Sequence, residues 1–172
     1  MKKGIILTIA GFTFLAGCGH QEQNAPITPK WPGAAYHIAF DTQASKPNPS
    51  GVTIPAIKFT ANPEALERRA CLVVRIDDAG AAKNKPLMNQ LVMGPVDING
   101  AAGALPADYM DEADKGLASL LESYGIKGKI KISVMLVRSS ISAQPGDDEI
   151  NEKRLSDWLP TDLVVTKGHT GR

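Results

Sequence analysis

Residues 106–138, PADYMDEADKGLASLLESYGIKGKIKISVMLVR, contain the clearest change of hydrophobic period in the chain and determine its fold class. Up to about Tyr124, apolar residues recur every three or four positions, which predicts one amphipathic helix. From Lys129 the apolar residues alternate with polar ones and then run on to Val137, which predicts a strand over residues 129–138. Gly125 lies between the two and is suited to end the helix in a left-handed conformation. The segment therefore predicts a helix followed by a sheet strand.

Both predicted elements have one side that is expected to be buried. The helix carries a single apolar stripe, made of Met110, Ala113, Leu117, Leu120, Leu121 and Tyr124. Every second strand residue is apolar, namely Ile130, Ile132, Val134 and Leu136. The intervening positions change from polar (Lys129, Lys131, Ser133) to apolar (Met135, Val137). We therefore expect the strand to be covered on one face at first and on both faces near its end.

Shorter segments of β composition lie on either side of this helix and strand. They are residues 35–40, 52–60, 72–76, 87–93 and 163–165. Segment 72–76 is nearly all apolar, which predicts a central strand. Pro55 has no backbone N–H to donate, so segment 52–60 is expected at a sheet edge or a bulge. Residues 99–104 (NGAAGA) are small, which favours a mobile loop.

Two further helices are expected from capping residues. One begins at Asn62-Pro63-Glu64 and runs to about Ala70. The other runs from about Glu149 to Leu159, with Asp148 as its cap. Helices interleaved with strands, without a glycine-rich turn after any strand, favour an α+β fold. We expect a mostly antiparallel sheet with two or three helices packed on one face.

The first eighteen residues have the three parts of an export signal. Lys2 and Lys3 are positively charged, an uncharged apolar run extends over residues 4–15, and two small residues precede Cys18. The apolar run is shorter than the roughly 20 residues that a membrane-spanning helix needs. We therefore expect export with removal of the signal.

The ending Leu15-Ala16-Gly17-Cys18 resembles the lipobox of bacterial lipoproteins. The resemblance implies cleavage before Cys18 and attachment of acyl chains to its thiol and amino group, which would hold the protein on a bilayer. In this class an Asp after the Cys favours the inner membrane, so Gly19 favours the periplasmic side of an outer membrane. The alternative is an ordinary secretory signal with a Cys placed there by chance.

These features divide the chain into four parts. Residues 1–17 are the expected signal peptide, and residues 18–33 combine the lipidated Cys with a polar tether that contains three prolines. Residues 34–167 are expected to form one globular α+β domain, and residues 168–172 a polar tail. The mature chain of about 155 residues is long enough for a domain with a proper core.

Composition limits the partners and the redox chemistry. The apolar and charged fractions, 43% and 22%, are those of globular proteins. The formal net charge is +1 and no Lys/Arg run resembles a phosphate-binding patch, so nucleic acid is not an expected partner. With Cys18 acylated, Cys71 is the remaining thiol, which excludes an internal disulfide. Cys71 begins an apolar run and is expected to be a buried structural thiol.

Clustered carboxylates are the first candidates for a metal site. The start of the predicted helix contains Asp108, Asp111, Glu112 and Asp114. Lys115 lies four residues after Asp111 as a salt partner, and acidic groups stabilise a helix start, so we interpret the cluster as a solvated helix end. Residues 147–149 (DDE) lack the alternating ligands of a calcium loop and are interpreted as helix capping.

Other catalytic constellations are not supported. Asp77 and Asp78 end the central strand, where a turn is the favoured interpretation. His20, His37 and His169 are far apart and show no zinc-ligand spacing. The sequence contains no nucleophile elbow, P-loop or dinucleotide fingerprint. It therefore favours a protein that is not an enzyme and that has no metal or cofactor.

The favoured function is that of a membrane-anchored accessory or adaptor, which binds another envelope protein in an assembly, secretion or conjugation apparatus. The expected contacts are the edge near Pro55, which could accept a partner strand, and the loop with Asn99, Gly100 and Gly103. One alternative is a periplasmic inhibitor or immunity lipoprotein, which would use the same loops. The other is a cell-envelope hydrolase with Asp77 or Asp78 in a cleft.

Overall fold

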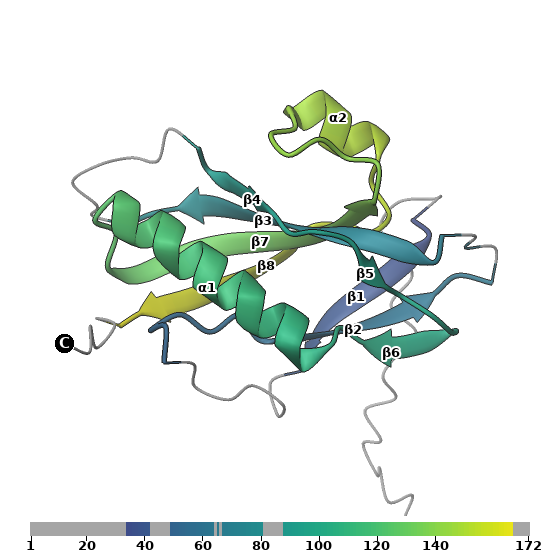
Figure 1. Ribbon diagram of the computed structural model, residues 1–172, viewed down its shortest axis with the longest axis horizontal. Helices are drawn as coiled ribbons and strands as arrows, with labels where there is room; N and C mark the ends of the chain where they lie inside the picture. The colour runs from purple at the N-terminus through teal and green to yellow at the C-terminus, as the bar shows by residue number, and fades with distance from the viewer. Residues whose placement is uncertain (1–33, 42–48, 64, 66, 81–87, 167–172) are drawn as a thin grey trace, which may run out of the picture.

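The computed structural model describes residues 34–41, 49–63, 65, 67–80 and 88–166 (Figure 1). The expected signal peptide, Cys18, the tether and the polar tail lie outside these residues. The strands are β1 (Tyr36–Asp41), β2 (Ala56–Ala61), β3 (Arg69–Asp78), β4 (Gln90–Val92), β5 (Val96–Asp97), β6 (Ala102–Ala104), β7 (Gly128–Arg138) and β8 (Leu159–Val165). The helices are α1 (Ala107–Ser123) and α2 (Asp147–Glu152).

The strands form two antiparallel sheets. The larger has the order β4-β3-β7-β8, and β5 pairs with the start of β3. The smaller has the order β1-β2-β6. β3 and β7 pair from Ala70 with Arg138 to Asp78 with Lys131, so both are central strands. These pairings confirm the α+β class, the antiparallel arrangement and the central place expected for segment 72–76.

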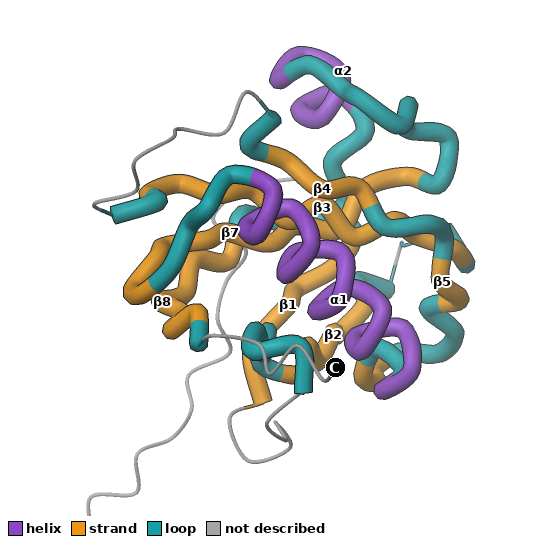
Figure 2. The backbone as a smooth tube through the Cα atoms, turned by 60° about the vertical axis from the view of Figure 1, so that its left-hand side comes forward, coloured by secondary structure: helices purple, strands orange, loops and turns teal. Residues whose placement is uncertain are grey.

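The main core lies between the two sheets and α1. β3 and β7 turn alternate residues toward it, among them Leu72 and Ile132, and β2 contributes Ile57. α1 buries most of the stripe expected from its sequence, namely Met110, Ala113, Leu117 and Leu121. In Figure 2, α1 runs past strands of both sheets. Each large apolar side chain buried here stabilises the fold by about 1.5–3 kcal/mol. Because both sheets contribute such side chains to this one core, the core couples the two sheets.

The opposite face of the larger sheet is partly covered by α2. Cys71 and Val73 of β3 and Met135 and Val137 of β7 pack there with Ile150 of α2. The two helices therefore lie on opposite faces of this sheet instead of together on one face, because this half of β3 and β7 is apolar on both sides. Cys71 is 4% exposed, as expected for a structural thiol, and burial raises its pKa.

The prediction of a short helix between Asn62 and Ala70 is wrong. Ala61 still belongs to β2, and Arg69 already belongs to β3. Ala65 N donates a hydrogen bond to Asn62 O at 2.9 Å, which closes a turn. So few residues separate the two strands that a helix could not offset its own nucleation cost.

α2 is shorter than the helix expected over residues 149–159, and Asp148 is not its cap. The helix ends at Glu152 and has no side-chain cap at its start. Leu155 N donates to Leu136 O at 2.8 Å, so the chain after the helix pairs with the end of β7. Backbone pairing with a central strand therefore takes the place of the helical residues expected after Glu152.

Candidate functional site

β4 is an edge strand whose outward backbone groups have no partner among the described residues. Asn89, Leu91 and Met93 form the hydrogen-bonded pairs with β3. Gln90 and Val92 lie between these pairs, so the N–H and C=O groups of both residues point away from β3. The larger sheet therefore ends on this side in a short row of donors and acceptors.

A tyrosine hydroxyl of α1 separates β4 from β5. Tyr109 Oη donates a hydrogen bond to Gly94 O at 2.7 Å and accepts one from Leu72 N at 3.1 Å. The hydroxyl takes the place of a ladder bond between β3 and the edge, and so interrupts the edge strand at Gly94. Burial raises the pKa of Tyr109, which keeps the hydroxyl protonated and able to donate.

α1 also holds the edge at its other end and in the middle. Tyr124 Oη accepts a hydrogen bond from Met88 N at 3.3 Å. Tyr109 and Tyr124 are fifteen residues apart, which is about 22 Å along a helix. Between them, a Cβ added to Gly116 would lie 3.1 Å from Leu91 Cδ2, so the glycine permits close approach of β4. The helix positions the edge strand and leaves its outward backbone groups free.

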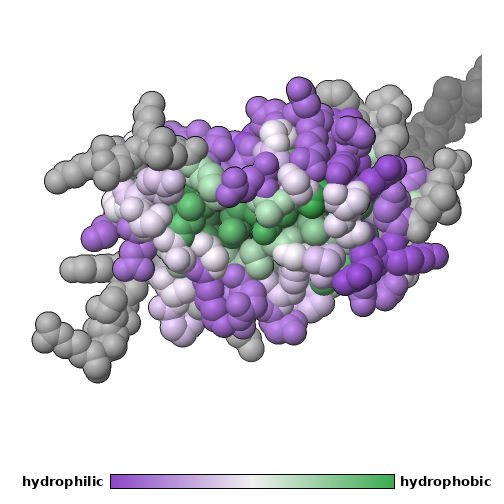
Figure 3. Space-filling model, turned by 45° about the horizontal axis from the view of Figure 1, so that its top comes forward, coloured by the Kyte–Doolittle hydropathy of each residue, from purple (hydrophilic) through white to green (hydrophobic). Residues whose placement is uncertain are grey.

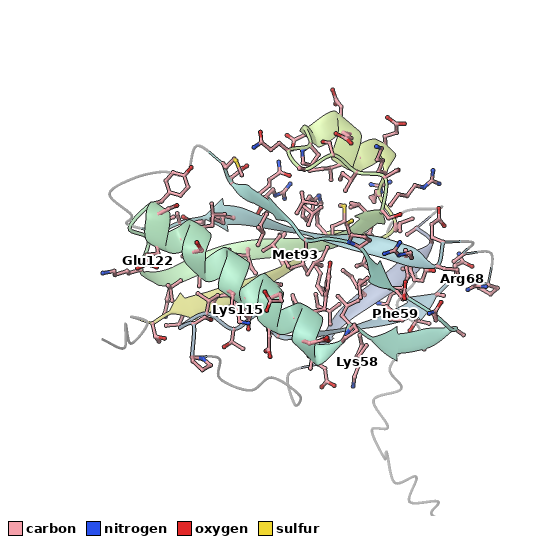
Figure 4. The ribbon with its side chains drawn as sticks, in the orientation of Figure 1. Lys58, Phe59, Arg68, Met93, Lys115 and Glu122 are labelled. Carbon is pink, nitrogen blue, oxygen red and sulfur yellow. The ribbon has the colours of Figure 1, made fainter. Side chains whose placement is uncertain are left out.

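The side chains along this edge form an apolar band on the surface. Leu91, Met93 and Leu120 are partly buried against the main core, and Val92 and Ile141 against the smaller cluster beneath α2. Figure 3 shows an apolar band between hydrophilic margins, in the gap between α1 and α2. In Figure 4, Met93 lies beside α1 where the chain passes from β4 to β5. Apolar surface next to unpaired strand backbone suits an added extended segment.

A hollow of about 560 Å³ lies at the β5 end of the edge and is acidic. Its apolar lining is Pro95, Val96, Pro106 and Tyr109, and its charged lining is Arg69, Asp97, Asp108 and Glu112. Arg69 Nε lies 3.3 Å from Asp97 Oδ1. Lys115 Nζ, which is not part of the lining, lies 2.6 Å from Glu112 Oε1. Asp108 is exposed and has no ion-pair partner within the described ranges.

A smaller hollow of about 190 Å³ lies at the other end of the edge. It is lined by Met88, Asn89, Gln90, Ala143, Gln144 and Pro145. Gln90 Oε1 is buried and accepts no hydrogen bond from any described residue. A buried amide oxygen without a donor is costly, so this end of the edge favours a ligand that supplies one.

The loop on the far side of the smaller hollow is held by a carboxylate. Ser142 N and Ser142 Oγ donate to Glu149 at 2.8 and 2.7 Å, and Lys153 Nζ lies 3.0 Å from Glu149 Oε1. The hydrogen bonds from Ser142, followed by Lys153, lower the pKa of Glu149 to about 2. The carboxylate therefore stays ionised and fixes the loop across the physiological range.

Asp77 and Asp78 have structural contacts. Asp77 accepts hydrogen bonds from Ser133 Oγ and from Arg75 Nε, the latter at 2.8 Å. The Arg75 guanidinium in turn lies 4.0 Å from the centre of the Trp158 ring. Asp78 Oδ1 accepts a hydrogen bond from Gly80 N at 2.8 Å, as in the expected turn. Neither residue lines the two hollows at the edge.

The acidic start of α1 is only partly the solvated cluster that we expected. Asp108, Asp111 and Glu112 are exposed. Asp114 is only 3% exposed and accepts a hydrogen bond from Ile54 N at 2.7 Å. The expectation for Asp114 was wrong because the helix places it beneath the segment that leads into β2.

The contact residues expected from the sequence lie around the smaller sheet. Pro55 directly precedes β2, which is not an edge strand because β1 and β6 flank it. Asn99 and Gly100 are exposed between β5 and β6, whereas Gly103 belongs to β6 and is not in a loop. A Cβ on Gly103 would lie 2.9 Å from Phe59 Cζ, so this small residue permits strand pairing over an aromatic ring.

The described residues contain no group of three His, Cys, Asp or Glu side chains arranged to hold a metal ion. His37 lies in β1, whereas His20 and His169 fall outside the described residues. No helix within the described ranges combines the length and the apolar character needed to cross a membrane.

Sequence reasoning did not identify the β4 edge as the candidate site. It predicted a strand over residues 87–93, and the structure has β4 within that segment. It treated Tyr124 as part of an apolar stripe and did not consider Tyr109. The spacing of Tyr109, Gly116 and Tyr124 places all three along one side of a helix, and this pattern was the available signal.

No protein-family model, curated protein or solved structure matches this chain.

Proposed function

We propose that this chain is a lipid-anchored accessory protein of the bacterial envelope, and that it binds a partner protein by pairing β4 with an extended segment of that partner. The observation that carries the proposal is the unpaired edge of β4 within an apolar surface band (Figure 3). Backbone hydrogen bonds to Gln90 and Val92 would supply affinity, and the flanking side chains would supply specificity.

The rigidity of the edge supports this proposal. Exposed edge strands are normally protected by charges, prolines or covering segments because they invite pairing with other chains. Here Tyr109 and Tyr124 fix the edge strand from one side and leave its outward groups accessible. A preorganised edge loses less conformational entropy on binding than a mobile loop would.

The anchor in the proposal rests on Cys18 and the residues before it. Acyl chains at the amino terminus of the mature chain would hold the domain near a membrane, with residues 19–33 as a tether. Labelling of cells with radioactive palmitate tests this directly. The wild-type protein is expected to incorporate the label and to fractionate with membranes. The Cys18→Ser variant is expected to do neither. Equal processing and fractionation of the two proteins would refute the anchor.

Site-specific photo-crosslinking tests the binding edge in intact cells. A photoreactive amino acid at position 92 is expected to trap one specific partner, whereas the same amino acid at position 164 should not. Val164 is the matched control because it is 60% exposed on β8, the opposite edge strand of the same sheet. The same trapping pattern at both positions, or none at either, would refute the proposal.

A pair of variants at one position then tests strand pairing with the purified partner. Val92→Pro removes an outward N–H, whereas Val92→Thr keeps the N–H and the shape of the side chain. Because the Val92 N–H does not bond β3, the proline leaves the ladder intact. Loss of one hydrogen bond and of close approach should weaken binding at least about tenfold for the proline variant. Equal weakening by both variants would indicate side-chain contact without strand pairing.

A further inference from the structure

We infer that the partner segment carries a lysine or arginine that enters the acidic hollow at the β5 end of the edge. This inference rests on the proposed pairing at β4 and adds the chemistry of the occupant. The hollow adjoins the free edge directly, because Pro95 and Val96 line it and follow β4 in the chain. A strand paired with Val92 would therefore continue into it.

The lining of the hollow matches a long cationic side chain. Pro95, Val96, Pro106 and Tyr109 offer apolar surface for a methylene stem. Lysine and arginine bury such stems while their charged ends remain near water or a carboxylate. A short or purely apolar side chain would leave the Asp108 carboxylate without an ion-pair partner among the described residues.

The charges point to a cation and not to an anion. Three carboxylates and one guanidinium line the hollow, and that guanidinium is already paired with Asp97. Lys115 approaches Glu112 from outside the lining (Figure 4 shows Lys115 on α1). Of the three carboxylates, that of Asp108 is therefore left to form a new ion pair. One exposed ion pair contributes modestly to affinity, and its contribution falls as the salt concentration rises. An acidic side chain at the same place would be strongly disfavoured, because the carboxylates of the hollow would repel it.

The geometry also predicts a spacing. Residues 95–97 lie three to five positions beyond Val92, which corresponds to about 10–17 Å along a strand. The basic residue should therefore lie three to five residues from the partner residue opposite Val92. It should precede the paired stretch if the partner strand runs antiparallel to β4 and follow it if the strands are parallel.

A selection on the purified full chain in detergent tests this without knowledge of the natural partner. A phage-displayed peptide library is selected on wild type, on Asp108→Lys/Glu112→Lys and on Val92→Pro. Wild type is expected to enrich peptides with alternating apolar residues and a lysine or arginine at one fixed spacing. The charge-reversed variant should enrich an acidic residue at that spacing and keep the apolar stretch. Enrichment of the same basic residue on both proteins would refute the inference and leave the proposed pairing intact.

Affinity measurements on one selected peptide complete the test. Replacement of its basic residue by norleucine should weaken binding about fivefold at low salt, and less at high salt. Asp108→Asn should weaken binding similarly, whereas Asp111→Asn should not. Asp111 is the matched control because it is exposed on the same helix but does not line the hollow. If wild type and Val92→Pro enrich no distinct peptides, both the inference and the proposed function fail.

Discussion

At the scale of single residues, one hydroxyl replaces a backbone hydrogen bond of the sheet. Leu72 N donates to Tyr109 Oη instead of to the edge strand, and the hydroxyl in turn donates a hydrogen bond to Gly94 O. A β ladder normally satisfies both groups by itself. The tyrosine therefore acts as a side-chain extension of the sheet and divides its edge into β4 and β5.

Tyr109→Phe should lower the free energy of unfolding by about 1–3 kcal/mol, because the buried Leu72 N–H loses its acceptor. Tyr124→Phe is the matched control, since its hydroxyl accepts a longer and exposed bond of 3.3 Å from Met88 N. That change should cost less than about 0.5 kcal/mol. Urea denaturation of both variants measures the difference. Equal losses would show that the Leu72 N–H finds another acceptor.

The ionised state of Glu149 makes the stability of the fold depend on pH, and the lowered pKa determines the direction of that dependence. Its folded pKa of about 2 lies below the ordinary value of 4.5, so its stabilising contribution is fully present above about pH 4.5. That contribution should disappear as the pH falls from about 4.5 to 2. The amide chemical shift of Ser142, which donates to Glu149, should follow this titration. Ser142→Ala should raise the pKa of Glu149 toward 4.5, and an unchanged midpoint would refute the assignment.

At the scale of elements, glycines set how closely α1 and β6 approach their neighbours. Gly116 lies beneath Leu91 of β4, and Gly103 lies against the ring of Phe59. Gly103 lies in strand β6, although a glycine normally weakens the interior of a strand. The reason is steric: the Phe59 ring is 4% exposed and packs edge-on against Tyr36, with centroids 6.0 Å apart, so it has little room to move.

Gly103→Ala should destabilise the protein by about 1–3 kcal/mol, because the new methyl group would lie 2.9 Å from Phe59 Cζ. Gly94→Ala is the control, since nothing lies within 4 Å of a Cβ at that position. It should change stability by less than about 0.5 kcal/mol. Thermal melts of the two variants provide the comparison. A neutral Gly103→Ala variant would support a mobile loop and contradict the β6 pairing.

At the scale of the whole molecule, one core connects both sheets to α1. Leu117 is fully buried, and the cluster that contains it draws residues from β1, β2, β3, β7 and α1. The smaller cluster beneath α2 belongs to the opposite face of the larger sheet. This arrangement predicts that the two sheets unfold together, because the main core belongs to both and the described residues of the smaller sheet form no core of their own.

Leu117→Ala should lower the free energy of unfolding by about 2–5 kcal/mol through loss of buried surface and creation of a cavity. The denaturation midpoint should fall equally for a probe in each sheet. Val134 in the larger sheet and Ile38 in the smaller, both followed by methyl NMR signals, serve as these probes. Separate midpoints for the two methyl signals would show that the sheets unfold independently.

The local sequence pattern was sufficient to predict an element whose structure depends on its own residues. The stripe from Met110 to Leu121 predicted α1, and Gly125 has the positive φ of 64° expected of a helix stop. The alternation that begins at Ile130 predicted which side of β7 is buried. Pattern failed at Asp114 and Gly103, because their environments come from Ile54 and Phe59, which are more than forty residues away in the chain.

The sequence by itself determined the α+β class, the long helix and the presence of strands in the segments of β3 and β7, because helix and strand periodicity follow from the geometry of the local backbone. It also contains the expected lipobox at Leu15–Cys18, a linear motif that does not depend on the fold. Only the tertiary structure decided which strands lie at a sheet edge and which lie inside a sheet. β2 received a second neighbour and β4 did not, since strand pairing depends on contacts between distant segments that no local pattern encodes.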